Sequence, residues 1–269
     1  MRPFLPILAA MAVLSGASRA AAQSDAETWR FDGLRNGYCI EFLVDSALIR
    51  GLLPDGAMPL RADRVQALHP AIARTVADQP EYGAWTPASA CFYMFDQVVV
   101  AGRPLPASSA AGEMIGFVSY SARLLEDRGR GGDVLDRLIT SNWKGMRSAD
   151  DQGLRLERSP VTLEDVPKST NRRITLKVDG TTLRWEGRDA GDSTAASAPL
   201  ERRWLVKGAD RRYRFVTMRV VPTSSRSMIG SLIVQGKGDL AKALRSSPIR
   251  YVGPNVRGGS GELVNQNAN

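Results

Sequence analysis

The sequence predicts a single α+β domain built on a strongly curved, mainly antiparallel, barrel-like β-sheet with two or three peripheral helices. Three observations predict this fold. Strand-like segments follow one another along most of the chain, separated by short turns. Few segments have helical periodicity. The 269 residues are 43% apolar and 24% charged, a composition typical of a folded protein. Because sequential strands joined by short turns pair with their neighbours, we expect an antiparallel sheet that curls or closes.

The start of the chain resembles an export signal. Arg2 supplies a positive charge, the apolar run Phe4–Leu14 follows, and Ala20–Ala22 forms a small-residue cleavage context. A helix that spans a membrane needs roughly 20 apolar residues, so a retained membrane anchor is the weaker alternative, and no later stretch is long enough. We therefore predict a signal peptide over residues 1–22 and an exported, periplasmic or extracellular protein, with residues 23–36 as an irregular lead-in.

The cysteine and histidine content excludes several kinds of site. With one histidine, His69, and two cysteines, the chain cannot form a His-rich zinc site or a two-histidine iron site, and we expect neither metal nor cofactor. Cys39 and Cys91 lie in strand-like segments, and export would place them in an oxidising compartment. They form either a cross-strand disulfide, worth roughly 4 kcal/mol on the chain-entropy model, or two buried free thiols.

Helices are expected at four places. Ala47–Leu53 forms a helical turn that ends at Pro54, and a second helical pattern around Val65–Val76 is interrupted by Pro70, giving one kinked helix or two short ones. His69 precedes that proline and is interpreted as structural. An apolar stripe predicts an amphipathic helix over Asp133–Met146. A short helix is expected at Asp239–Arg245.

Strands account for most of the remaining chain. Asp179-Gly180 separates two of them and is the strongest short hairpin signal. Residues 148–168 and 188–199 are expected as polar loops, and the tail 253–269 as disordered because it has few apolar residues. The β-rich domain would therefore span residues 37–252. The strands are expected at Tyr38–Val44, Cys91–Val100, Met114–Leu124, Arg173–Val178, Thr182–Glu186, Arg203–Val206, Tyr213–Val220 and Ile229–Gln235.

The sequence has no phosphate-binding loop, dinucleotide fingerprint, nucleophile elbow or H-E-x-x-H motif. Three stretches nevertheless occur in an informative order. Leu52–Gly56 reads L-L-P-D-G. Phe95–Val98 reads F-D-Q-V. Ala111–Tyr120 reads A-G-E-M-I-G-F-V-S-Y.

Together these stretches resemble the acetoacetate decarboxylase superfamily, with the motifs L-L-P-x-G, Y-x-E-V and G-R-E-x-x-G-[FY]-P-K-K. Glu113, Gly116 and Phe117 match the third motif, whereas Gln97 stands where glutamate is usual. With a similar C-terminal segment, the resemblance covers Tyr38–Ser246 and implies a curved antiparallel sheet around an apolar cavity. The alternative is an unrelated lipocalin-like barrel or β-sandwich.

The sequence departs from the third motif at the two lysine positions, and this difference affects the reaction that the site could catalyse. In the superfamily, a lysine of the K-K pair forms a Schiff base with a β-keto acid, and its neighbour lowers the pKa of that amine. Ser119 and Tyr120 occupy these places, and Gly112 replaces the arginine of G-R-E. Neither hydroxyl can form an imine. The resemblance therefore implies a divergent member without Schiff-base decarboxylase activity.

The strand that carries this motif contains the candidate site. Its odd-numbered residues from Glu113 to Ser121 share one face, which mixes apolar and hydrogen-bonding groups as a small-molecule pocket does. Glu113 would pair with Arg123 or remain unpaired on this face. In the alternative interpretation, Glu113 begins an exposed strand and Ser119 faces solvent. The predicted ligand-binding residues are Gln97, Glu113, Phe117, Ser119, Tyr120 and Arg123.

Three functions are compatible with these observations. The first is binding of a small, partly apolar or acidic ligand without catalysis. The second is a lyase or hydratase that uses Glu113 as acid or base and Tyr120 as hydrogen-bond donor. The third is a cell-envelope protein whose basic strands, within a chain of net charge +8, contact acidic polymer or lipid. Export disfavours nucleic acid as a partner. The third function would use Arg202, Arg203, Arg211 and Arg212.

Overall fold

The computed structural model describes residues 28–100, 102–108, 112–125, 131–142, 144–147, 154–159, 161–165, 171–196, 198–207 and 213–267. The strands in the first half are β1 (Thr28–Val44), β2 (Ala57–Pro59), β3 (Thr86–Val100), β4 (Arg103–Pro104), β5 (Glu113–Leu124), β6 (Gly131–Thr140), β7 (Leu156–Arg158) and β8 (Val161–Asp165). Those in the second half are β9 (Arg172–Val178), β10 (Thr181–Ala195), β11 (Leu200–Lys207), β12 (Tyr213–Val221), β13 (Ser224–Gly236), β14 (Arg250–Val252), β15 (Asn255–Arg257) and β16 (Ser260–Asn267). The helices are α1 (Ser46–Ile49), α2 (Pro70–Asp78) and α4 (Asp239–Ser246), with 3-10 turns η1 (Ala62–Arg64) and η2 (Pro80–Ala84).

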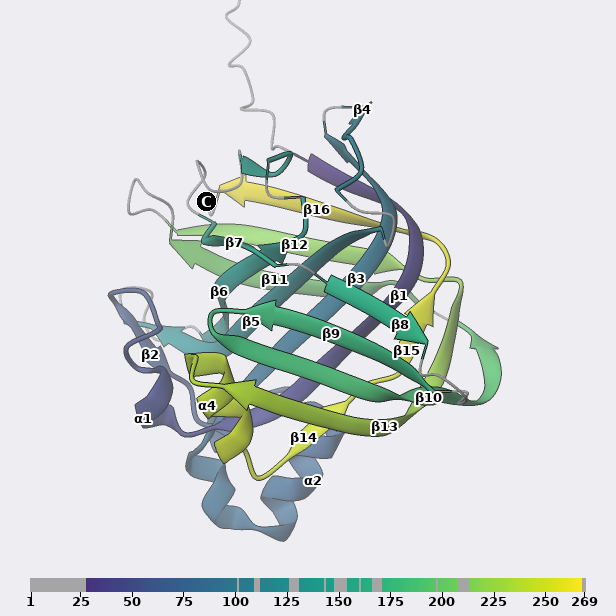
Figure 1. The fold of residues 1–269 in the computed structure, drawn as a ribbon. Helices are drawn as coiled ribbons and strands as arrows, with labels where there is room; N and C mark the ends of the chain where they lie inside the picture. Colours follow the sequence, from purple (N-terminus) through teal and green to yellow (C-terminus); the bar gives the residue numbers. More distant parts are fainter. Residues whose placement is uncertain are drawn as a thin grey trace, which may run out of the picture.

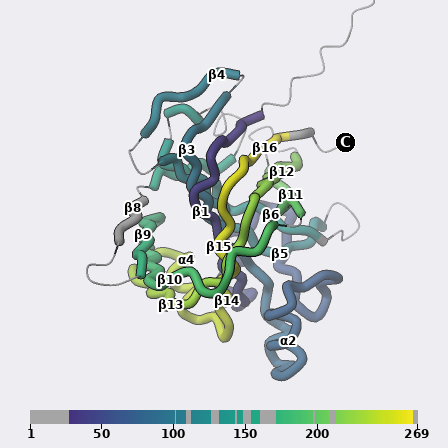
Figure 2. Tube along the Cα trace, turned by 90° about the vertical axis from the view of Figure 1, so that its right-hand side faces the viewer, coloured from purple at the N-terminus to yellow at the C-terminus, as the bar shows by residue number. Residues whose placement is uncertain are grey.

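The strands form one strongly curved, mostly antiparallel sheet, which confirms the predicted fold class. One run of pairings, β1–β3–β5–β6–β11–β12–β16, returns to β1 because β1 pairs with both β3 and β16, so these strands form a ring. A second run, β15–β13–β10–β9–β8, continues from β1. Figure 1 shows β9, β10 and β13 crossing in front of β1 and β3, and Figure 2 shows them as a separate layer beside the ring.

The two faces of the ring strands pack into two different cores. The ring-interior core receives one large apolar side chain or more from every ring strand. The outer core lies between the outside of the ring and the second layer with α4. On β5, Phe117 belongs to the ring interior, whereas Val118 and Tyr120 belong to the outer core. Burial on both faces explains why β5 lacks a polar face.

The hairpin and the proline break follow the sequence. Asp179 and Gly180 both have positive φ angles, 45° and 61°, as a two-residue hairpin turn requires. Of the expected helical pattern, only the part from Pro70 is helical: α2 begins at Pro70, which needs no backbone N–H at that position, and residues 65–69 form no helix. The His69 Nδ1 atom caps this helix by accepting a hydrogen bond from the Ala71 N–H at 3.2 Å.

Several expectations about local structure are wrong. Residues 28–36 of the expected lead-in belong to β1, and the expected tail forms β15 and β16, where β16 closes the ring between β1 and β12. Their stability comes from backbone pairing with neighbours distant in sequence, which a low apolar content does not reveal. β10 likewise extends to Ala195 through the expected loop by pairing with β13.

The helix expected over Asp133–Met146 is also wrong, because Gly131–Thr140 forms β6. Residues 134–140 are buried on both faces, so apolar residues occur there without strict alternation and imitate a helical stripe. Within the loop expected over 148–168, β7 and β8 form, and the remaining residues up to 153 and from 166 lie outside the described part of the chain. The expected signal peptide also lies outside it. In the part that the structure describes, no helix is long and apolar enough to cross a membrane.

Candidate functional site

A pocket of about 240 Å³ lies at one end of the ring, and we call it the ring-mouth pocket. Five successive ring strands contribute to it: β1, β3, β5, β6 and β11. The segment that leads into α2 lies over the same pocket. The complete lining comprises Glu41, Val65, Ala67, Leu68, His69, Ile72, Pro87, Ala88, Ser89, Ser121, Asp133 and Arg202.

An ion pair connects two sides of the ring mouth. The Arg202 guanidinium on β11 donates to the Glu41 carboxylate on β1, although β12 and β16 separate these strands in the ring. The Glu41 side chain is 8% exposed and the Arg202 side chain 37% exposed. A buried carboxylate needs such a partner, because removal from water costs several kcal/mol when no partner is present. The half-buried guanidinium keeps part of its surface toward the pocket.

Serine hydroxyl groups form the floor of the pocket. Ser89 on β3 lies directly opposite Ser119 on β5, and their Oγ atoms are 2.9 Å apart. Ser119 is buried and does not line the pocket itself; its hydroxyl contacts the hydroxyl of Ser89, which does. The Ser121 hydroxyl donates to the Asp133 carboxylate at 2.8 Å. The floor is therefore polar and internally hydrogen-bonded.

Below this floor the ring is filled rather than hollow. Cys39 and Cys91 are opposite each other on β1 and β3 and form a disulfide, so the first of the two expected cysteine states is confirmed. The rings of Phe117 and Trp204 stack with their centroids 4.5 Å apart. Tyr93 is buried in the same core. Among the described residues, the ring-mouth pocket therefore lies above a packed interior.

The structure separates the residues predicted from the motif. Phe117 and Ser119 reach the ring interior below the ring-mouth pocket. Gln97 and Arg123 are exposed on their strands. The β3–β5 register pairs Ser89 with Ser119, which leaves Gln97 eight residues further along β3 and remote from the pocket.

Glu113 is buried at the opposite end of β5 from Ser121. Its carboxylate accepts hydrogen bonds from the backbone N–H and hydroxyl of Ser108, and from the Ser141 hydroxyl at 3.0 Å. These bonds hold the segment before β5 against the turn after β6. Neither the pairing with Arg123 nor the exposed alternative occurs.

Tyr120 points into the outer core, away from the ring. Its hydroxyl is buried without a hydrogen-bond partner, and burial raises the pKa of Tyr120 well above its ordinary value, with the Asp136 charge as the next cause. The hydroxyl is therefore neutral at physiological pH. Glu113 and Tyr120 do not meet in one site, so the structure does not assemble the acid–base pair of the lyase hypothesis.

Sequence reasoning missed the charged residues of the ring mouth. Glu41 was detectable in principle, because it interrupts the apolar strand segment Y-C-I-E-F-L-V. Arg202 was grouped with surface arginines, but it turns into the ring mouth, whereas its neighbour Arg203 lies over the Phe215 ring at 3.7 Å. Residues 211 and 212 lie outside the described residues. Only the ring closure brings Glu41 and Arg202 together.

The lining of the ring-mouth pocket limits its chemistry. Its described residues include carboxylates, hydroxyls, an imidazole and a guanidinium, but no lysine. Across the described part of the chain, no group of three or more His, Cys, Asp or Glu residues is placed to hold a metal ion. The pocket can therefore bind a small molecule through hydrogen bonds and charge, and its own side chains supply no amine for an imine.

No protein-family model matches the sequence, and no curated protein does either. Among solved structures, an acetoacetate decarboxylase from Legionella pneumophila is similar over 98% of both chains, with a TM-score of 0.52 and 10% identity. An acetoacetate decarboxylase-like enzyme from Sphingomonas wittichii is similar over 97% of this chain and 98% of that one, with a TM-score of 0.48 and 12% identity. The enduracididine biosynthesis enzyme MppR, complexed with pyruvate, covers 91% of each chain at a TM-score of 0.48 and 14% identity.

At these identities the likeness concerns the backbone and not the chemistry of the site. It agrees with the curved sheet described above. This chain therefore has the fold of the acetoacetate decarboxylase-like proteins.

Proposed function

We propose that this protein binds a small acidic molecule in the ring-mouth pocket and does so without forming a Schiff base. The observation that carries the proposal is the Ser89–Ser119 hydroxyl pair, because Ser119 occupies a lysine position of the superfamily motif. A hydroxyl can donate and accept hydrogen bonds, but it cannot condense with a carbonyl to give an imine. A carbonyl compound that reaches this floor is therefore bound reversibly.

Arg202 supports the acidic character of the ligand. Among the described residues of the lining it is the only fixed cation, and its exposed surface faces the pocket while one of its amino groups contacts Glu41. A guanidinium has five N–H donors in a planar fork, so it can bind a second carboxylate beside the first. Glu41 and Asp133 limit the ligand to one negative charge, because a second would meet like charges.

The proposal includes export. The disulfide between Cys39 and Cys91 supports it, since disulfides persist in oxidising compartments and are rare in the cytosol of mesophiles. Expression of the full chain in a bacterium with two membranes, followed by fractionation and intact mass measurement, tests this part. We expect recovery from the periplasm with a new N-terminus at Gln23. Recovery of the full-length chain from the cytosol would contradict it.

Binding is tested by isothermal titration with acetoacetate, pyruvate and the neutral ester methyl acetoacetate. We expect saturable binding of one acid per chain, at least tenfold tighter than the ester. Arg202→Met should weaken acid binding about tenfold or more, as the loss of a charge-assisted hydrogen bond does. Arg203→Met is the matched control, because the neighbouring guanidinium lies over Phe215 and outside the pocket lining.

An NMR measurement on the unmodified protein keeps the test independent of variant stability. Acetoacetate should shift the backbone amide resonances of Ser89 and Ser121 and leave those of β9 unchanged. Equal affinities for acid and ester, or shifts that do not include the ring mouth, would overturn the proposed function.

A further inference from the structure

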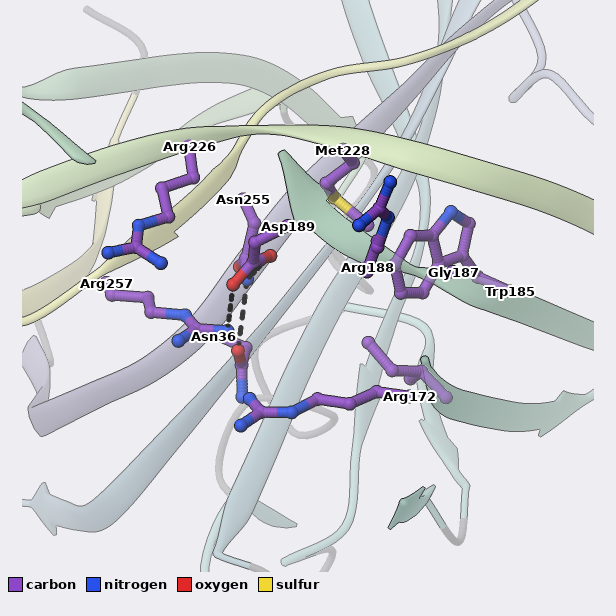
Figure 3. A pocket seen from close by; sticks show the side chains of 11 residues that line it. Asn36, Arg172, Trp185, Gly187, Arg188, Asp189, Arg226, Met228, Asn255 and Arg257 are labelled. Atoms are coloured by element: carbon purple, nitrogen blue, oxygen red, sulfur yellow. Dashed lines mark hydrogen bonds and ion pairs between the residues drawn. The ribbon is translucent and has the colours of Figure 1, made fainter. Parts of the chain in front are cut away.

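A second pocket, of about 260 Å³, lies on the other face of β1, between the ring and the second layer. We call it the arginine pocket, and Figure 3 shows its side chains. Four strands each contribute one arginine: Arg172 on β9, Arg188 on β10, Arg226 on β13 and Arg257 on β15. The remaining lining comprises Asn36, Ile174, Trp185, Gly187, Asp189, Met228 and Asn255.

The charge of this lining is strongly unbalanced. The lining holds four guanidinium groups and one carboxylate, that of Asp189. Asp189 pairs with Arg257 at 2.6 Å and accepts a hydrogen bond from the Asn255 amide at 3.1 Å. In the described part of the chain, Arg188 and Arg226 have no carboxylate partner. An anion that enters the pocket would therefore meet two guanidinium groups whose charge no described carboxylate neutralises, and it would be attracted to them.

Buried amides hold the single carboxylate in place. The Asn255 amide also donates to the Asn36 side-chain oxygen at 3.2 Å, and the Asn255 oxygen accepts from the Gly37 N–H at 3.2 Å. Asn36 and Asn255 are 6% and 5% exposed. This network fixes Asp189 beside Arg257, as Figure 3 shows by dashed lines, and it leaves the guanidinium groups of Arg188 and Arg226 available to a ligand.

An apolar wall completes the pocket. Trp185 is 3% exposed and forms this wall with Ile174 and Met228. A Cβ atom on Gly187 would lie 2.6 Å from the Trp185 ring and 2.3 Å from the Ile229 carbonyl oxygen. Glycine is therefore required here for the indole to pack over the strand and for β10 and β13 to approach closely. A flat or apolar group of a ligand could lie against this wall.

We propose that the arginine pocket binds a small organic anion with two or more negative charges next to an apolar or planar part. Guanidinium groups recognise carboxylate and phosphate oxygens alike through paired N–H donors. The concave shape and the apolar wall favour a small molecule over a polymer or a lipid surface, which would need an exposed, flat basic face. Because Asn36 and Glu41 lie on opposite faces of β1, this site is separate from the ring-mouth pocket.

The experiment uses phthalate as an aromatic dicarboxylate, benzoate as its single-charge analogue and dimethyl phthalate as its neutral analogue, each titrated at low salt by calorimetry. Pyrophosphate reports whether phosphate charge binds without the apolar part. We expect one phthalate per chain, bound at least tenfold more tightly than benzoate, with affinity that falls as salt rises. Phthalate should shift the indole N–H resonance of Trp185 in the unmodified protein.

The double variant Arg188→Gln/Arg226→Gln should bind phthalate at least tenfold more weakly. The control Arg74→Gln/Arg250→Gln removes the same charge from two exposed arginines outside both pockets, and its affinity should stay within twofold. Equal weakening in both variants would mean that only net charge matters and would overturn the proposal. Retention on phosphatidylglycerol vesicles without phthalate binding would also overturn it, in favour of a lipid surface.

Discussion

The two pockets lie on opposite faces of β1 and handle charge in different ways. In the ring-mouth pocket, the one arginine is paired with a buried carboxylate from across the ring. In the arginine pocket, four arginines surround one carboxylate. Arginine thus completes a structural ion pair in the first pocket and supplies excess positive charge in the second. The comparison shows that the net charge of +8 does not by itself locate a binding surface.

Reduction of the disulfide should have the largest effect on stability, and it should leave ligand binding in the arginine pocket unchanged. The bond links β1 to β3 inside the ring, and its partners are 52 residues apart in sequence. We expect the free energy of unfolding to fall by about 4 kcal/mol on the loop-entropy model. Urea unfolding with and without dithiothreitol measures this change. Phthalate affinity of the reduced, still folded protein should not change; a parallel loss would mean that the two pockets are coupled.

A rise in pH should have the second-largest effect, by lowering the free energy of unfolding through a tyrosine in the ring interior. Burial raises the pKa of Tyr93 to about 12, with smaller opposite contributions from Arg202 and Glu41. The native state then keeps a proton that the unfolded chain releases near pH 10. The stabilisation is therefore complete below pH 10 and is lost as pH rises through 12, by about 2–3 kcal/mol from Tyr93 alone. Unfolding measured from pH 8 to 12 checks this loss, and Tyr93→Phe should make the decline less steep. An unchanged decline in that variant would contradict the assignment to Tyr93.

Removing one arginine from each pocket compares them directly. Arg202→Met should lower the free energy of unfolding by about 2 kcal/mol, because it leaves the Glu41 carboxylate buried without its partner. This figure is smaller than that for a fully buried pair, because Arg202 is partly exposed. Glu41→Gln in the same chain should recover part of the loss. Arg226→Met should change stability by less than about 0.5 kcal/mol, because that residue is exposed and no described carboxylate pairs with it. Thermal and urea unfolding measure both changes, and equal losses of stability in Arg202→Met and Arg226→Met would show that the two arginines do not differ in role.

Glu113→Gln should have a smaller effect on stability than Arg202→Met, about 1 kcal/mol, since the amide keeps one acceptor oxygen but loses charge-assisted hydrogen bonds from Ser108 and Ser141. Binding of acetoacetate should remain unchanged, because Glu113 lies at the opposite end of β5 from the ring mouth. Loss of substrate α-proton exchange in this variant would instead support the lyase hypothesis.

The sequence allowed the fold class, the Asp179-Gly180 hairpin and a break in the helical pattern at Pro70 to be predicted, because each depends on local residue chemistry or on a short motif. It left the two cysteines open between a disulfide and free thiols. It did not reveal β6 or β16. β6 is buried on both faces and so lacks alternation, and β16 is stabilised by pairing with β1, more than 200 residues away. The pockets were missed for the same reason. Glu41 meets Arg202, and Arg188 and Arg226 line one pocket, only after distant strands have closed the ring and its second layer.

The central claim is that hydroxyl groups occupy the place where an amine would attack a carbonyl carbon. Incubation of the folded protein with acetoacetate and sodium borohydride, followed by intact mass measurement and peptide mapping, tests it most directly, with a lysine-dependent decarboxylase as the positive control. We expect the mass of this chain to stay unchanged while the control gains a reduced adduct. A reduced adduct on any lysine of this chain, formed in proportion to the substrate, would contradict the account.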